Sequence, residues 1–162
     1  MAYPSRPMSL ETSILAEHSG AAETTDWASV EADLDLVRHT RANLLVIGPD
    51  RLMPDVIRAV VGPTPAIIVN PAEWERLALS HLWLWSGTLV FRDIDALDAE
   101  GQTVLSAWLE RGSPERQIVS MAGKPLMPLV AAGAFDQRLY YRLNTVFISL
   151  GHAPCALAPV RG

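Results

Sequence analysis

The stretch from Ser86 to Arg111 constrains the fold most, because a buried strand and an amphipathic helix follow each other within it. Residues 88–91 form an apolar run with high β propensity, which is typical of a strand buried on both faces. The helix that follows has an apolar face consisting of Val104, Leu105, Trp108 and Leu109. By the same spacing, Gln102 points away from that face. Arg92 and Asp93 lie just past the carboxyl end of the strand, where ligands bind in open α/β sheets, so any chemistry should take place near Asp93.

Short apolar strands alternate with helices over most of the chain. The expected strands are residues 43–48, 66–69, 88–91, 117–121 and 144–150. The expected helices are residues 26–40, 52–61, 72–81, the helix that contains Trp108, and one or two short helices within 125–142, broken near Gly133. This alternation predicts an α/β fold, a three-layer sandwich whose parallel sheet is covered on both faces and connected by right-handed crossovers.

Length and charge limit the classes of protein that remain. The chain of 162 residues predicts one domain, with an irregular N-terminal arm (1–23), an α/β core (24–150) and a C-terminal tail (151–162). Its net charge of −5 leaves no basic surplus for nucleic acid. A lone cysteine, Cys155, and the lack of a signal peptide or a membrane-spanning apolar run favour a cytoplasmic protein without membrane contact.

The turn after the first strand has the frame of a phosphate-binding loop but little of its chemistry. Such a loop reads G-x-x-x-x-G-K-[ST], and here residues 48–55 read GPDRLMPD. Gly48 keeps the first position, but the second glycine, the lysine and the hydroxyl are all replaced. Two prolines each remove an amide donor, and two aspartates would repel phosphate. Arg51 is the one residue that could compensate, so a plain strand-to-helix turn is the favoured interpretation.

Four segments resemble the AAA+ ATPase domain of sigma-54-dependent transcription activators. GTLVFRDIDAL, followed by QTVLSAWLER, resembles the Walker B strand and the next helix, which in the family read GTLFLDEI-x-x-L. LMPLVAAGAFDQRLYYRLN resembles the stretch ending in F-R-E-D-L-Y-Y-R-L-N, NLLVIG resembles VLITGE, and AIIVNP resembles PFVxVNC. The resemblance covers roughly residues 27–150. It implies a five-stranded parallel sheet in the order 5-1-4-3-2, an AAA+ or P-loop NTPase-like core.

The departures from the family pattern fall on its catalytic positions. The Walker B aspartate that holds magnesium falls on Arg92, and the adjacent water-orienting glutamate falls on Asp93. The sensor asparagine falls on Gly123. Of the two arginines that reach a neighbouring subunit's nucleotide, the first falls on Asp136 and the second is Arg142, a subunit-edge arginine.

Whole segments of the family are also missing. The seventeen residues between Asn70 and Thr88 are too few for the GAFTGA loop that touches the sigma factor, and we expect no helical lid. The segment Leu82-Trp83-Leu84-Trp85 replaces the sigma-contacting region. Either it enters the core ahead of the strand, which is favoured, or Trp83 and Trp85 form a partner surface, since tryptophan is enriched in interface anchors.

These observations favour a protein without enzymatic activity. Phosphoryl transfer needs positioned phosphate, bound metal and an activated water, and all three depend here on altered residues. We expect a pseudo-ATPase with no resident cofactor or metal, which binds a protein partner, either a full-length activator or a copy of itself. The alternative is an ATP/ADP-binding sensor or weak ATPase, in which Gly48, Arg51, Arg92 and Asp93 form a degenerate nucleotide site. A decayed paralogue is a third possibility.

Overall fold

The computed structural model describes residues 27–78 and 81–151, and within them a single five-stranded parallel sheet. The strands are β1 (Leu44–Ile47), β2 (Ala66–Val69), β3 (Thr88–Phe91), β4 (Gln117–Ala122) and β5 (Val146–Ser149). They lie in the order β2-β3-β4-β1-β5, and every neighbouring pair is parallel. This is the order 5-1-4-3-2 read from the opposite edge. The expected α/β class and topology are therefore confirmed.

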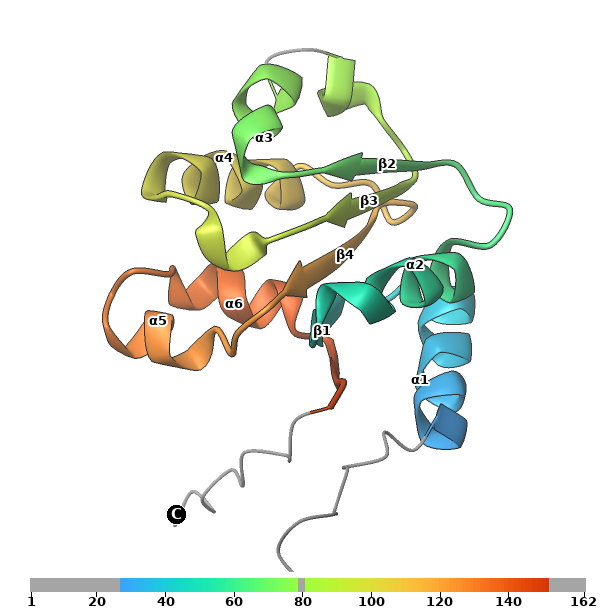
Figure 1. The fold of residues 1–162 in the computed structure, drawn as a ribbon. Coiled ribbons are helices and arrows are strands. Elements are labelled where there is room, and N and C mark those ends of the chain that lie inside the picture. Colours follow the sequence, from blue (N-terminus) through green and yellow to red (C-terminus); the bar gives the residue numbers. More distant parts are fainter. Residues whose placement is uncertain (1–26, 79–80, 152–162) are drawn as a thin grey trace, which may run out of the picture.

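Helices connect the strands and cover both faces of the sheet (Figure 1). They are α1 (Trp27–Thr40), α2 (Met53–Val61), α3 (Pro71–Ala78), α4 (Ala99–Glu110), α5 (Met127–Ala131) and α6 (Gln137–Leu143). The helix expected over 72–81 ends at Ala78, and a 3-10 turn, η2 (His81–Leu84), follows it. Two further 3-10 turns, η1 (Asp50–Leu52) and η3 (Ile94–Ala96), lie just past β1 and β3. Nearly all of the expected arm and tail lies outside the described residues. Across the described ranges, no helix has the length and apolarity needed to cross a bilayer.

Two hydrophobic cores lie on the two faces of the sheet. One packs β residues against α3, α4 and α6, with Leu45, Leu89, Phe91, Trp74, Trp108 and Leu139 among its members. The other packs the opposite face against α1 and α2, with Val46, Val90, Leu34, Val37 and Val56 among its members. Strand side chains alternate between these cores because successive residues point to opposite faces. Figure 1 shows α1 and α2 side by side, as their mutual contacts require.

Gln102 corrects the sequence prediction, because it lies buried in the core rather than pointing away from it. Its side-chain amide donates to the carbonyl oxygens of Leu97, at 2.8 Å, and Ala134, at 3.0 Å. Its Oε1 accepts from the backbone N–H of Asp136 at 2.8 Å. Gln102 therefore fastens the start of α4 to the loop between α5 and α6. A buried amide that makes all these bonds avoids the cost of desolvation, which helical periodicity alone does not reveal.

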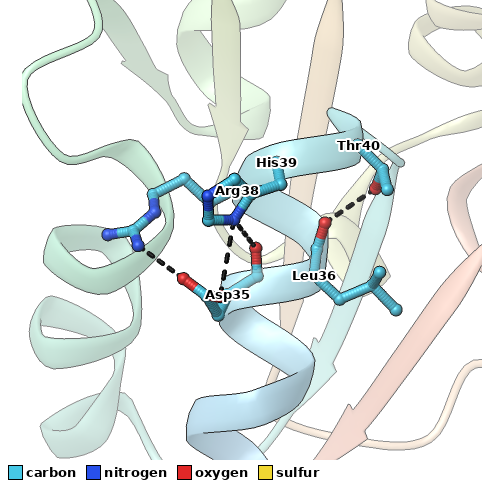
Figure 2. A network of polar contacts seen from close by, with 5 residues as sticks. All are labelled: Asp35, Leu36, Arg38, His39 and Thr40. Atoms are coloured by element: carbon cyan, nitrogen blue, oxygen red, sulfur yellow. Dashed lines mark hydrogen bonds and ion pairs between the residues drawn. The ribbon is translucent and has the colours of Figure 1, made fainter.

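The last turn of α1 is closed by its own side chains (Figure 2). Asp35 pairs with Arg38, and the Nδ1 of His39 donates to the Asp35 carbonyl oxygen at 2.8 Å. Thr40 Oγ1 donates to the carbonyl oxygen of Leu36 at 2.8 Å. These side-chain bonds add to the helical bonds of the last turn, and the basic side chains complement the negative end of the helix dipole. The outer surface of α1 is mostly polar and charged, with Leu36 as an exposed apolar side chain.

Candidate functional site

The carboxyl ends of four strands surround one open depression of about 530 Å³. Residues after β1, β3, β4 and β5 line it: Gly48, Pro49, Asp50, Arg51, Asp93, Asp95, Gly123, Lys124 and Gly151. This is the edge of an α/β sheet at which ligands bind, and its volume suits a small molecule. Of the four residues predicted for a degenerate nucleotide site, Gly48, Arg51 and Asp93 lie together here, whereas Arg92 does not line the depression.

The turn after β1 is built for packing. The N–H of Gly48 donates to the Ala122 carbonyl oxygen at 3.1 Å, so this amide extends the ladder between β1 and β4. A Cβ added to Gly48 would lie 2.7 Å from the Cβ of Leu150, closer than real Cβ contacts come. Pro49 offers no N–H, and Pro54 occupies the first turn of α2. The close approach of Leu150 explains this glycine without any phosphate.

Asp93 occupies a backbone conformation that few residues other than glycine adopt. Its φ of 50° and ψ of 44° lie in the left-handed region, which aspartate tolerates better than most residues. Its carbonyl oxygen accepts from Ala96 at 2.9 Å and so begins the turn η3. Arg92, one residue earlier, is exposed, and its N–H donates to the Val69 carbonyl at 2.8 Å. Strain of this kind often occurs where a side chain must be aimed at a ligand.

The charges around the depression are mixed. Arg51 and Lys124 supply two cations, and Asp50, Asp93 and Asp95 supply three carboxylates. Within residues 27–78 and 81–151 no ion pair joins any of them. Nor do the described residues contain a group of three or more histidine, cysteine or acidic side chains that could hold a metal ion.

Sequence reasoning overlooked Lys124, although a signal was present. It is the single lysine of the whole sequence and follows the carboxyl end of β4 directly, with only Gly123 between them. Because the carboxyl ends of parallel strands meet at one edge, its position after β4 places it beside the turn after β1. The phosphate-loop pattern covers residues 48–55 only, so it predicted Arg51 as the one compensating cation. Asp50 and Asp95 were also missed as lining residues.

Arg142, the predicted subunit-edge arginine, lies on α6 and interacts within its own chain. Its guanidinium pairs with Glu110 Oε1 on α4 at 3.3 Å, and both side chains are partly exposed. Its carbonyl oxygen accepts from the amide of Asn43 at 2.9 Å. Asp136, where the resemblance places the other arginine, caps α6 by accepting from the N–H of Leu139 at 2.7 Å.

The tryptophan-rich segment divides between core and surface. Leu82 is buried, and Trp85 packs against the first core, with its ring so close to Gly87 that an added Cβ would lie 2.8 Å away. The indole N–H of Trp85 is buried and has no partner among the described residues. Leu84, by contrast, is 83% exposed. The side chain of Trp83 lies outside the part of the chain that is described.

Comparison with protein families gives one match. The model of the sigma-54 interaction domain matches residues 21–152, most of the chain. A search of curated protein sequences returned no significant match. The matched range begins before α1 and ends just past β5, so it contains the whole sheet and every residue of the depression.

Solved structures with the same fold include two bacterial regulators. NtrX from Brucella abortus, in complex with ATP, is 19% identical with a TM-score of 0.62, and the match covers 86% of this chain and 39% of NtrX. The P-loop NTPase domain of the sigma-54 transport activator from E. coli is also 19% identical, with a TM-score of 0.56. That match covers 73% of this chain and 97% of the E. coli domain. At this identity the likeness shows the P-loop NTPase fold.

Proposed function

The chain belongs to the family of sigma-54 interaction domains, and on that premise we propose that it is a non-hydrolysing AAA+-like module of bacterial transcription control. It acts by binding a protein partner, either a full-length activator or a second copy of itself. It works in the cytoplasm and contacts neither membrane nor nucleic acid. It needs no ATP or magnesium for this role.

One observation carries the proposal, namely the state of the backbone amides after β1. A phosphate loop cradles its ligand with free N–H groups at a helix N-terminus. Here the Gly48 amide is used by Ala122, residues 49 and 54 are prolines, and the Asp50 carboxylate lines the depression. A triphosphate at this position would meet few donors and a like charge. The turn therefore supports binding of nucleotide poorly.

The residues at the magnesium and water positions, Arg92 and Asp93, also support a module that does not hydrolyse ATP. By resemblance the magnesium-holding aspartate falls on Arg92, whose exposed side chain does not line the depression. Asp93 does line it, but one carboxylate cannot both hold a hydrated metal and orient the attacking water. Substitution of a cation for the metal-binding carboxylate removes the charge that magnesium needs.

The partner surface that the structure supports differs in detail from the one expected from sequence. Trp85 packs into the core, and its neighbour Leu84 is the large apolar side chain that faces solvent. We therefore propose that an activator contacts the exposed Leu84 of η2, whereas Trp85 packs against the core and Trp83 stays a prediction.

Calorimetric titration of the purified chain with ATP and ADP, with and without magnesium, tests the proposal. We expect no saturable heat up to millimolar nucleotide, and a rate of phosphate release equal to that of buffer. The isolated AAA+ domain of a sigma-54 activator, titrated in parallel, serves as the positive control. Magnesium-dependent hydrolysis by this chain would contradict the proposal directly.

A second candidate function, an ATP/ADP-binding sensor, is favoured by the two cations of the depression. Lys124 supplies from β4 an ammonium group that the altered turn after β1 lacks, and Arg51 supplies a guanidinium from that turn. If nucleotide binds, Lys124→Met and Arg51→Met should each weaken binding at least tenfold. Arg58→Met is the matched control, because Arg58 pairs with Asp55 at 3.0 Å and does not line the depression.

A further inference from the structure

Strand β2 forms one outer edge of the sheet, and within the described residues no strand lies beyond it (Figure 1). The carbonyl oxygens of Pro65 and Val69 accept from Thr88 and Arg92, so these residues face β3. Because backbone polar groups alternate along a strand, the N–H and C=O groups of Ala66 and Ile68 face outward. Both are non-proline residues, so the outer edge presents a complete pair of donors and acceptors.

The four residues of β2 carry no charge and pair with β3 in continuous register, so neither charge nor a bulge protects this edge. Natural edge strands carry charges, bulges or covering elements that prevent pairing with another chain. Here Ile68 is 52% exposed, and from residue 59 to residue 91 the only charged residues are Glu73, Glu75 and Arg76. In a chain with a net charge of −5, a stretch with so few charged residues lets two copies approach with little repulsion.

We propose that β2 pairs with β2 of a second copy of this chain, antiparallel about a twofold axis at Ile67. In this register Ala66 of each copy lies opposite Ile68 of the other, and the two exchange their N–H and C=O groups. The exposed Ile68 side chain is then covered by Ala66 of the second copy on the same face. The inference deepens the proposed function, since it names the self-binding surface of the interaction module.

The opposite edge, β5, is a natural comparison because it is equally apolar. Phe147 is 49% exposed, and by the same alternation its backbone groups also face outward, since Val146 and Leu150 donate to Asn43 and Ile47 on the β1 side. However, α1 contacts β5 and carries the exposed acids Glu31 and Asp35, of which Asp35 is paired with Arg38. Pairing of two copies across β5 would bring these like charges together. Self-pairing is therefore expected at β2 alone.

Sedimentation velocity of the full chain over a range of concentrations tests the proposal. We expect wild-type protein to show a concentration-dependent dimer, and Ile68→Lys to raise the dimer dissociation constant at least tenfold. Phe147→Lys is the matched control and should leave that constant unchanged. Ile68→Pro sharpens the test, because it removes an outward N–H and leaves the bonds to β3 in place. Circular dichroism of each variant verifies that the chain remains folded.

The possible outcomes separate this inference from the proposed function. A wild-type chain that stays monomeric at millimolar concentration, or a dimer weakened equally by Phe147→Lys, overturns the β2 interface. Neither result affects the titration with nucleotide, which separately tests whether the module binds or hydrolyses ATP. A folded Ile68→Pro variant that dimerises as tightly as wild type also overturns the interface.

Discussion

The junction of α4 with the α5–α6 loop and the turn after β1 both lie at the carboxyl end of the sheet, but they are built differently. At the junction, Gln102 is buried and all its polar groups are bonded, and Asp136 caps α6. Around the turn, Arg51 and Lys124 line an open depression and form no ion pair with the described acids there. Side-chain hydrogen bonds therefore hold the junction together, whereas Arg51 and Lys124 form no ion pair within the described residues.

The comparison teaches which residues carry the resemblance to the family. In the segment that ends RLYYRLN, Phe135, Leu139 and Leu143 are buried, and Tyr140 Oη accepts from the amide of Asn144 at 2.9 Å. These three apolar side chains belong to the first core. By the resemblance, positions 92, 93, 123 and 136, which differ from the family pattern, lie outside these buried residues. The buried residues alone can therefore account for the shared fold, and the fold does not decide the activity.

Removal of the Gln102 amide should have the largest effect on stability. Gln102→Ala leaves the buried Leu97 carbonyl oxygen and the half-buried Ala134 carbonyl and Asp136 N–H without this partner, at a cost of roughly 3 kcal/mol in the free energy of unfolding. Urea denaturation measures this loss. Gln137→Ala is the control, because Gln137 is an exposed glutamine in the first turn of α6. A loss below 1 kcal/mol for Gln102→Ala would mean that the junction does not depend on these bonds.

The next largest loss of stability is expected at Gly48, in the turn after β1. Gly48→Ala places a methyl group 2.7 Å from the Leu150 Cβ and 3.0 Å from its carbonyl oxygen, so the backbone must shift at a cost of about 2 kcal/mol. Gly123→Ala lines the same depression but meets nothing within 4 Å, and it should be neutral. Thermal unfolding of the two variants checks this difference. Equal melting temperatures would contradict the inference that close packing against Leu150 requires a glycine at position 48.

Much of the fold could be predicted because its signals are local. The apolar runs at β1, β2 and β3 and the helical spacing in α1 and α4 each predict one element, and the strand order follows from the resemblance. Gln102 could not be placed, because helical periodicity assigns a polar residue to solvent. Its partners Ala134 and Asp136 lie more than thirty residues along the chain. Such a bond is decided by tertiary packing, which no local pattern contains.

The candidate site was predictable in location but only partly in composition. The rule that ligands bind at the carboxyl ends of parallel strands identified the region of Gly48 and Asp93. It did not separate Arg92 from Asp93, since the left-handed backbone of Asp93 decides which of the two side chains lines the depression. The same rule, applied to β4, would have predicted that Lys124 lines the depression. The exposure of Leu84 could not be predicted in this way, because it depends on how η2 packs.

A smaller effect is expected from restoring the family residue at Asp136. Asp136→Arg removes the carboxylate that accepts from the N–H of Leu139, so α6 loses its cap at a cost of about 1 kcal/mol. Asp136→Asn should retain most of the stability, because its amide oxygen can accept the same bond. Chemical denaturation of both variants separates the two cases. If the Asp136→Arg variant proves as stable as the Asp136→Asn variant, the cap of α6 does not contribute measurably to stability.

The smallest effect on stability is expected for the ion pair between Arg142 and Glu110. Its measurement tests whether Arg142 acts within its own chain or on a neighbouring subunit. Arg142→Ala breaks a partly exposed pair with Glu110, so the free energy of unfolding should fall by only a few tenths of a kcal/mol, and less at high salt. A double-mutant cycle with Glu110→Ala measures the pair itself. If Arg142 instead acted on a neighbouring subunit, Arg142→Ala would weaken self-association and Glu110→Ala would strengthen it by freeing the guanidinium. Unchanged sedimentation of both variants would show that Arg142 serves its own chain.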